Sequence, residues 1–337
     1  MTVLVTGGAG FLGSHVAGLL VERGEVPRVL VRPGESAAAV ADSDVEIRWG
    51  DLADDTAMES AVRGVECVLH CAARTGPWGP KAEYERTNVG ALETLVRAAM
   101  AAGVRRVVHV SSITVHGNDV RGAADESAPL REEPNPYSRS KVAGERVLER
   151  MIREDGAPVT IVRPGWIYGP GDRASFGRLA QRIADGRMLM VGSGKNHVPL
   201  IYVRDAARGV VLAGEAEGAV GRSYLLVNDE PVTQQDFIAA IAAELDVPAP
   251  TRHLPYKLAL SLGAAAETVG RLARRTEPPP VMRYGLQLLG GENRLNVARA
   301  REELGFEPQV DLAEGIRRSV AWYRGADEPA QAAKVPA

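Results

Sequence analysis

Several features that mark specialised proteins are scarce in this chain of 337 residues. The best membrane-span candidate, LALSLGAAAETVG, is shorter than the roughly 18 apolar residues that a span requires, and Ser261 and Glu267 interrupt it. Strand-like residues begin at residue 2, so no basic-then-apolar leader is expected. A net charge of -3 and a pI near 6.1 give no electrostatic reason to expect nucleic acid or an anionic membrane as partner. We therefore expect a cytoplasmic protein without a membrane span.

Cysteine and histidine are also few. Cys67 and Cys71 lie four residues apart in an expected strand. That separation is about 13 Å at the strand rise, too long for a disulfide. The histidines lack the short spacing of zinc ligands, so we expect no metal site. They include His15, His109, His116, His197 and His253.

The sequence instead alternates short β-rich runs with helical stretches. Strands are expected at residues 3–6, 28–31, 67–71, 107–111 and 159–162, and helices at 11–23, 56–62, 84–102 and 137–154. Continuous apolar strands joined by helices are typical of a parallel sheet covered on both faces. The pattern predicts an α/β fold with a Rossmann-type, doubly wound parallel sheet over residues 1–165.

The regular alternation of strand-like and helical stretches ends after Arg163. Glycine-rich loops, a strand-like SYLLV run and a proline break at 278–280 follow. We expect residues 166–325 to form a smaller mixed α/β substrate-binding region, with some segments returning to the sheet. Residues 326–337 read as a disordered tail.

Three evenly spaced glycines, Gly7, Gly10 and Gly13, follow the first expected strand and open a helix. Such a turn lets a dinucleotide pyrophosphate approach the backbone, and the helix N-terminus offers unpaired N–H groups to it. The simpler alternative is a tight turn. We favour a cofactor site that also includes Phe11 and Leu12.

Arg32 suggests which dinucleotide binds. It ends the second expected strand, about 20 residues beyond the glycines, where NAD enzymes usually carry Asp or Glu for the ribose diol. A guanidinium instead attracts a 2′-phosphate, and Ser36 lies nearby. The sequence therefore predicts NADP(H) rather than NAD(H).

A second cluster of polar residues points to catalysis. In NPYSRSK, Asn135 can cap a helix, and Tyr137 and Lys141 then share one face. A nearby ammonium would favour the phenolate and lower the tyrosine pKa. Ser111 and Ser112 end a predicted strand, where parallel-sheet enzymes place their chemistry. A serine hydroxyl there could polarise a carbonyl that also meets Tyr137.

The glycine spacing, GDLAD, HCAA, VSS, YSRSK and RPGWIYGPGD occur in the order found in extended short-chain dehydrogenases/reductases, which the chain resembles from residue 2 to about residue 324. The resemblance implies that Tyr137 is the catalytic acid/base. It implies that Lys141 holds the nicotinamide ribose and tunes the tyrosine. Ser112, rather than Ser111, would orient the substrate oxygen.

The same resemblance implies further cofactor contacts. Asp51 and Leu52 would meet the adenine, although Asp51 could instead cap a helix. Asn88 could be a cofactor contact or a structural amide. The remaining implied contacts are Ala72 and Ala73 along the cofactor, with Pro164 and Gly165 beside the nicotinamide.

The segment GPWGPKAEYERTNVGALETLVRAAMAAGVRRVVHVSS resembles the 3β-hydroxysteroid dehydrogenase branch, which includes dihydroflavonol-reductase-like enzymes. Sugar-nucleotide enzymes of this superfamily usually carry Asn and Arg where this chain has Trp166 and Val198. An apolar substrate fits better, with Trp78 and Trp166 as pocket walls or as ordinary packing. LPYKLALSLGAAAETVG could cover that pocket or pack its apolar side on the core.

We therefore expect an NADP(H)-dependent ketoreductase or hydroxy dehydrogenase for a hydrophobic ketone or secondary alcohol of steroid, lipid or polyketide type. The alternative is a sugar-nucleotide epimerase, dehydratase or 4-ketoreductase. A non-catalytic NADP-binding sensor is disfavoured, because a sensor has no need of a tuned phenol. The expected partner is a small-molecule substrate, and a homodimer is a further possibility.

Overall fold

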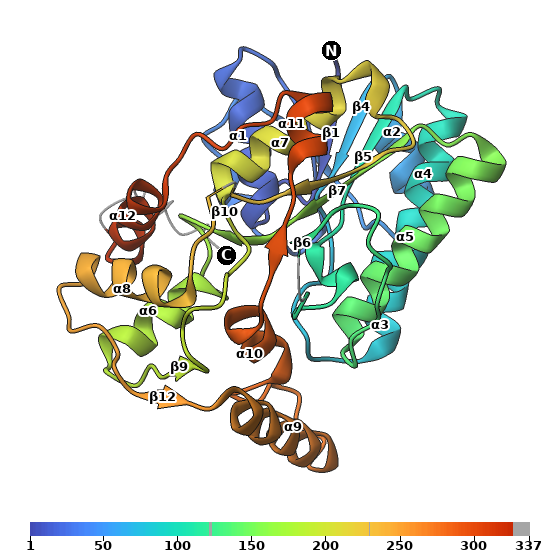
Figure 1. Ribbon diagram of the computed structural model, residues 1–337. Helices are drawn as coiled ribbons and strands as arrows, with labels where there is room; N and C mark the ends of the chain where they lie inside the picture. Colours follow the sequence, from blue (N-terminus) through green and yellow to red (C-terminus); the bar gives the residue numbers. More distant parts are fainter. Residues whose placement is uncertain (121–122, 229, 326–337) are drawn as a thin grey trace, which may run out of the picture.

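The computed structural model describes residues 1–120, 123–228 and 230–325 (Figure 1). The expected tail at 326–337 lies outside these ranges. Seven parallel strands form the main sheet in the order β11-β7-β5-β4-β1-β2-β3. They are β1 (Val3–Thr6), β2 (Arg28–Val31), β3 (Glu46–Trp49), β4 (Cys67–His70), β5 (Arg106–Val110), β7 (Val159–Pro164) and β11 (Ser223–Leu226). The predicted Rossmann-type sheet is confirmed.

Helices cover both faces of this sheet (Figure 1). Alternate residues of a strand point to opposite faces. Val3 and Val5 accordingly pack in the cluster that includes α1 (Phe11–Glu22) and α7 (Val203–Glu215). Leu4 packs in a separate cluster on the other face. That face is covered by α2 (Asp55–Val62), α4 (Ala91–Ala101) and α5 (Pro136–Asp155).

The expected helix at 84–102 is divided in the structure. It consists of α3 (Lys81–Glu85), a π-helical turn η2 (Arg86–Gly90) and α4. A π-helical turn is uncommon and often marks a functional site. Here it carries the buried Asn88.

The rest of the chain forms small parallel sheets and helices, mostly beyond the carboxyl ends of the main strands, whereas α11 (Ala298–Leu304) lies beside α7 and the start of β11 (Figure 1). β8 (Trp166–Tyr168) pairs with β10 (Leu200–Tyr202), β9 (Met190–Val191) with β12 (His253–Leu254), and β6 (Ala123–Ala124) with β13 (Arg294–Leu295). The helices are α6 (Phe176–Ala184), α8 (Gln234–Glu244), α9 (Tyr256–Leu272), α10 (Arg283–Gly290), α11 (Ala298–Leu304) and α12 (Leu312–Tyr323). Short 3-10 turns are η1 (Ala38–Val40), η3 (Ile113–His116) and η4 (Glu217–Ala219).

One hydrophobic cluster joins the sheet to this second region. It runs from Val3 of β1 to Phe237 of α8 and Ile316 of α12. α7 and β11 belong to the layers of the main sheet although they follow residue 165. The division into 1–165 and 166–325 stays a prediction. In the part of the chain that is described, no helix is both long and apolar enough to cross a bilayer.

Candidate active site

The glycine-rich turn lies at the carboxyl end of β1, where the strand order reverses between β1 and β4. Gly7 has φ +66, and a Cβ there would lie 2.7 Å from the Cα of Ala72, which follows β4. A Cβ on Gly13 would lie 2.1 Å from the oxygen of Gly7. Both glycines are therefore required by close backbone packing.

Gly10 differs from these two glycines. It is the exposed N-cap of α1, no side chain caps it, and a Cβ there would meet only the oxygen of Gly7, at 3.1 Å. The start of α1 thus keeps an open approach to its N–H groups, which suits a pyrophosphate. Half-buried Phe11 lies beside Gly171, and Leu12 is buried in the core. The geometry of this turn fits a dinucleotide.

The other predicted cofactor residues lie at the ends of neighbouring strands. Arg32, just after β2, is half-exposed and its Nη2 lies 2.6 Å from Oε1 of Glu35. Half-buried Asp51 accepts a 2.9 Å hydrogen bond from the N–H of Ala53. The cap of α2 is Asp54, so the alternative of Asp51 as that cap is wrong.

The remaining predicted cofactor residues lie along the same edge of the sheet. Ala72 and Ala73 follow β4, and Leu52, in the loop after β3, packs against the core cluster that contains Leu30. Pro164 ends β7, and a Cβ on Gly165 would lie 2.2 Å from the oxygen of Pro199.

Tyr137 and Ser112 meet beyond the end of β5. Asn135 caps α5 by accepting a 2.8 Å hydrogen bond from the N–H of Ser138, and this cap places Tyr137 in the first turn. The side chains of Tyr137 and Ser112 interact there. Burial raises the pKa of Tyr137 to about 12, and the interaction with Ser112 opposes the rise only in part.

Lys141 lies one turn further along α5 and is buried. Its Nζ donates a 2.7 Å hydrogen bond to the carbonyl oxygen of Val110, at the end of β5. Burial lowers the pKa of Lys141 to about 8, against the opposing effect of Glu145. The expected lowering of the Tyr137 pKa by Lys141 is not found, because the phenol is desolvated and Lys141 is not among the groups that perturb it.

Ser111 has a different partner from Ser112. Its hydroxyl donates to the fully buried carboxylate of Glu145. Arg163 holds the same carboxylate through Nε at 3.0 Å and Nη2 at 2.6 Å. Ser111 therefore belongs to a buried ion-pair network, and Ser112 is the serine that faces Tyr137. Glu145 was missed in the sequence analysis, although it continues the i, i+4 spacing of Tyr137 and Lys141.

An apolar cluster adjoins this site. Ile113, Leu225, Val227, Leu288 and Val297 form its buried centre. Trp166, Leu295 and Tyr284 of α10 pack against it. The ring of Tyr284 also meets that of Tyr137 edge to face, with centroids 6.1 Å apart. Nothing in the sequence indicated Tyr284, because it is far from Tyr137 along the chain.

The two tryptophans predicted to line the pocket lie apart from each other. Trp166 in β8 stacks edge to face on Phe237, with centroids 5.6 Å apart. Trp78 instead donates from Nε1 to the oxygen of Arg275, 3.1 Å away, and packs against Gly270 of α9. Only Trp166 joins the cluster that contacts Tyr284.

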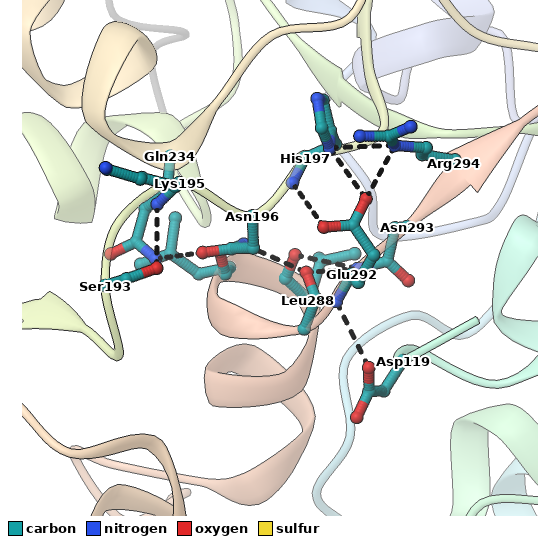
Figure 2. A network of polar contacts seen from close by, with 12 residues as sticks. Asp119, Ser193, Lys195, Asn196, His197, Gln234, Leu288, Glu292, Asn293 and Arg294 are labelled. Atoms are coloured by element: carbon teal, nitrogen blue, oxygen red, sulfur yellow. Dashed lines mark hydrogen bonds and ion pairs between the residues drawn. The ribbon is translucent and has the colours of Figure 1, made fainter. Parts of the chain in front are cut away.

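A polar network holds α10 in this position (Figure 2). Asn196 donates to the oxygens of Leu289 and Gly291 at 2.7 and 2.9 Å. His197 Nδ1 lies 2.7 Å from Oε1 of Glu292, which Arg294 also contacts. The next residue, Val198, is buried. The polar groups near this position therefore bind one another.

Other candidate residues have structural partners. Asn88 accepts from the N–H of Arg74 at 2.8 Å and donates to Arg74 and Ser140, so its amide clamps the loop after Ala73. Cys67 and Cys71 are free thiols. Among the residues that the structure describes, no group of three His, Cys, Asp or Glu side chains is arranged to hold a metal ion.

Comparison with known proteins identifies the family. Residues 3–226 match the model of the NAD dependent epimerase/dehydratase family. The chain is 34% identical to the 2-alkyl-3-oxoalkanoate reductase of Stenotrophomonas maltophilia (strain K279a), over 94% of this chain and 98% of that protein. It is 28% identical to the 3 beta-hydroxysteroid dehydrogenase/Delta 5-->4-isomerase of Mycobacterium tuberculosis (strain CDC 1551 / Oshkosh), over 95% and 90%.

Solved structures agree on the fold. The UDP-glucuronic acid 4-epimerase from Bacillus cereus, in complex with NAD, superposes with a TM-score of 0.77 and 20% identity, over 97% of this chain and 100% of that one. The chain belongs to the NAD-dependent epimerase/dehydratase family. The predicted likeness to extended short-chain dehydrogenases/reductases is confirmed, and the protein is an oxidoreductase of that superfamily.

Proposed function

We propose that this chain is an NADP(H)-dependent ketoreductase or hydroxy dehydrogenase for a hydrophobic ketone or secondary alcohol of steroid, lipid or polyketide type. The observation that carries the proposal is the interacting pair of hydroxyl-bearing side chains, Ser112 and Tyr137, beside the apolar cluster around Leu288. A ketone oxygen placed between them would accept a hydrogen bond from each. The carbonyl would then be polarised at a site with apolar walls.

The protonation state of Tyr137 favours a role as acid. With a pKa of about 12 its hydroxyl is protonated at neutral pH, and it can donate that proton to an oxygen that becomes an alkoxide. When bound, the nicotinamide supplies the hydride that the carbonyl carbon receives. Lys141 lies one turn away with its Nζ on the oxygen of Val110, from where it would hold the cofactor ribose. This arrangement supports reduction of a ketone.

The choice of NADP(H) rests on Arg32. Its half-exposed guanidinium stands just beyond β2, where a carboxylate would otherwise bind the ribose diol. The nearest acid, Glu35, is bound to Arg32 and does not replace that carboxylate. A 2′-phosphate could take the guanidinium from Glu35, because it offers more charge and a bidentate geometry.

The substrate class rests on what is missing for a sugar diphosphate. Val198 is buried and apolar, and Trp166 is stacked on Phe237. His197 and Arg294, close to Val198, both contact Glu292. A buried phosphate without cationic partners is very costly. The names of the two relatives, one for a 2-alkyl-3-oxoalkanoate and one for a 3β-hydroxysteroid, point the same way.

The test is a substrate panel. NADPH consumption and thermal shifts are measured with apolar β-keto compounds beside UDP- and TDP-sugars, with the Tyr137→Phe variant as the catalytic control. We expect turnover with apolar ketones that disappears in the variant. Stabilisation by a nucleotide sugar, with none from the apolar panel, would instead favour an epimerase, dehydratase or 4-ketoreductase. The cytoplasmic location and the homodimer stay predictions.

A further inference from the structure

Helix α9 presents its small residues to the protein body and its large apolar residues to solvent. The buried positions are Ala259, Gly263, Glu267 and Gly270. A Cβ on Gly263 would lie 3.1 Å from the backbone nitrogen of Arg283 in α10. The two helices therefore approach closely, and α9 has no bulky apolar side chain between them. The expected packing on the core holds for Leu254 and Tyr256 but is wrong for Leu258, Leu262 and Val269, which are exposed, and the pocket cover stays a prediction.

An ion pair completes the attachment of α9. The carboxylate of Glu267 accepts from the N–H and Nη2 of Arg283, each at 2.8 Å. Glu267 is buried and Arg283 is partly exposed, so the carboxylate of this pair is shielded from water. The close contact at Gly263 and the ion pair of Glu267 fix the rotation of α9 about its axis. This rotation turns the large apolar residues toward solvent.

The outer face is an apolar stripe. Leu258, Leu262, Val269 and Leu272 are 48%, 51%, 64% and 80% exposed. With the exposed Ala265 they recur at three- and four-residue intervals, which places them in one row along the helix. Half of the eight large hydrophobic side chains that are exposed among the described residues lie in this one helix. A contiguous patch of this kind marks a binding surface.

Basic residues flank the apolar stripe. Lys257 precedes it, and Arg274 and Arg275 follow the C-terminal end of α9, all three exposed. None of these three forms an ion pair with any other residue in the described ranges. The acidic residue of α9, Glu267, is already bound to Arg283. The surface around the stripe is therefore locally basic, although the chain as a whole has a net charge of -3.

The basic residues around the apolar stripe help to decide what covers it, a second copy of the chain or an anionic bilayer. A second copy of the chain, paired through the stripe about a two-fold axis, would bring Lys257 and the arginines of one helix against those of the other. Like charges would then meet at both ends of the interface. An anionic bilayer surface offers phosphate groups to the cations and an apolar layer to the stripe, and long cationic side chains reach the headgroups easily.

We propose that α9 is an interfacial helix that binds the surface of a bilayer containing anionic lipid. The apolar stripe would enter the boundary between headgroups and acyl chains, and Lys257, Arg274 and Arg275 would bind lipid phosphates. Such a helix lies on the membrane and does not span it. The inference stands independently of which substrate the enzyme reduces.

The test is co-sedimentation of the full-length protein with phosphatidylcholine–phosphatidylglycerol vesicles, compared with pure phosphatidylcholine vesicles. The stripe variant carries Leu262→Ser, Val269→Ser and Leu272→Ser. The matched control carries Val26→Ser, Trp49→Ser and Val220→Ser, which also removes exposed apolar side chains but from other surfaces. A charge variant carries Lys257→Gln, Arg274→Gln and Arg275→Gln.

We expect the wild type and the matched control to sediment with anionic vesicles, and the stripe variant to stay in solution with an unchanged thermal midpoint. The charge variant should lose affinity by on the order of a hundred-fold, and added salt should weaken wild-type binding. Failure of the wild type to bind, or equal binding by the stripe variant, would overturn the proposal. A wild-type dimer that the stripe variant abolishes, without vesicle binding, would instead assign this face to a second copy.

Discussion

The ring of Tyr284 lies edge to face against the ring of Tyr137, with centroids 6.1 Å apart. Tyr284 belongs to α10, which begins many residues after the last strand of the main sheet. The second region of the chain therefore reaches the candidate acid directly. This contact leaves less room for the Tyr137 ring on the side of α10.

This ring contact leads to a prediction for Tyr284. An edge-to-face aromatic pair is worth about 0.5–1.5 kcal/mol, so Tyr284→Leu should lower kcat/KM by roughly two- to tenfold through misplacement of Tyr137. Tyr284→Phe keeps the ring and is the matched control, with activity close to wild type. Steady-state kinetics of both variants would measure the difference. Equal kinetics in the leucine variant and wild type would show that the ring does not position Tyr137.

Removal of the Tyr137 hydroxyl tests the acid itself. Tyr137→Phe keeps the ring contact with Tyr284 and should leave folding and cofactor binding intact. Turnover should fall by about 10²–10⁴-fold, the typical value of a general acid. Cofactor titration by fluorescence and single-turnover kinetics would separate the two effects. Near wild-type turnover in this variant would remove Tyr137 from the mechanism.

The two neighbouring serines should respond in opposite ways. Ser112→Ala removes a hydroxyl that contacts Tyr137, so it should lower turnover with little change in stability. Ser111→Ala removes a donor from the buried carboxylate of Glu145 and should cost about 1–3 kcal/mol of unfolding free energy. Urea unfolding and turnover are measured on both variants, and we expect the main loss in turnover for Ser112→Ala and in stability for Ser111→Ala. The opposite pattern would assign the catalytic hydroxyl to Ser111.

Cofactor preference is tested at Arg32. Arg32→Ala should weaken NADPH binding by roughly 10- to 100-fold and leave NADH binding nearly unchanged, because only NADPH carries the 2′-phosphate. Glu35→Gln is a second arm: it frees the guanidinium from its ion pair and should preserve or strengthen NADPH binding. Arg48→Ala, on the neighbouring strand β3, controls for general loss of positive charge. Unchanged NADPH affinity in Arg32→Ala would contradict NADP(H) preference.

The sequence was sufficient for most of the main sheet and for the motifs around Tyr137. The edge strand β3 was not among the expected strands, because none of its residues is fully buried and it lacks a continuous apolar run. Local patterns determine these features: apolar runs become buried parallel strands, and Asn135 with Pro136 begins α5. The glycines predicted the tight turn after β1 correctly, because close backbone contact at Gly7 and Gly13 leaves no room for a side chain. In each case the information lies within a few neighbouring residues.

Other features depended on contacts between distant segments. The separate roles of Ser111 and Ser112 arise from Glu145 and Arg163, and these residues approach only after α5 packs beside β7. The outward apolar face of α9 depends on Gly263 and Glu267 facing α10. The hydrophobic pattern alone assigns large residues to the interior, which is wrong for the four exposed ones, Leu258, Leu262, Val269 and Leu272.

The buried amine of Lys141 makes the stability of the cofactor-free protein depend on pH. Burial lowers its pKa from 10.5 to about 8. Between these values the unfolded chain binds more protons than the folded one, so this group makes the free energy of unfolding rise with pH. Below about pH 8 the buried amine lowers the free energy of unfolding by its full amount, roughly 3 kcal/mol, and this loss disappears as the pH rises toward 10.5.

The Lys141→Met variant should lack this rise of the unfolding free energy with pH. Urea unfolding of both proteins across this range measures the difference. The opposing effect of Cys67, whose pKa burial raises to about 12, cancels in that difference because Cys67 does not interact with Lys141. Parallel curves for the two proteins would mean that Lys141 keeps an ordinary pKa in the folded state.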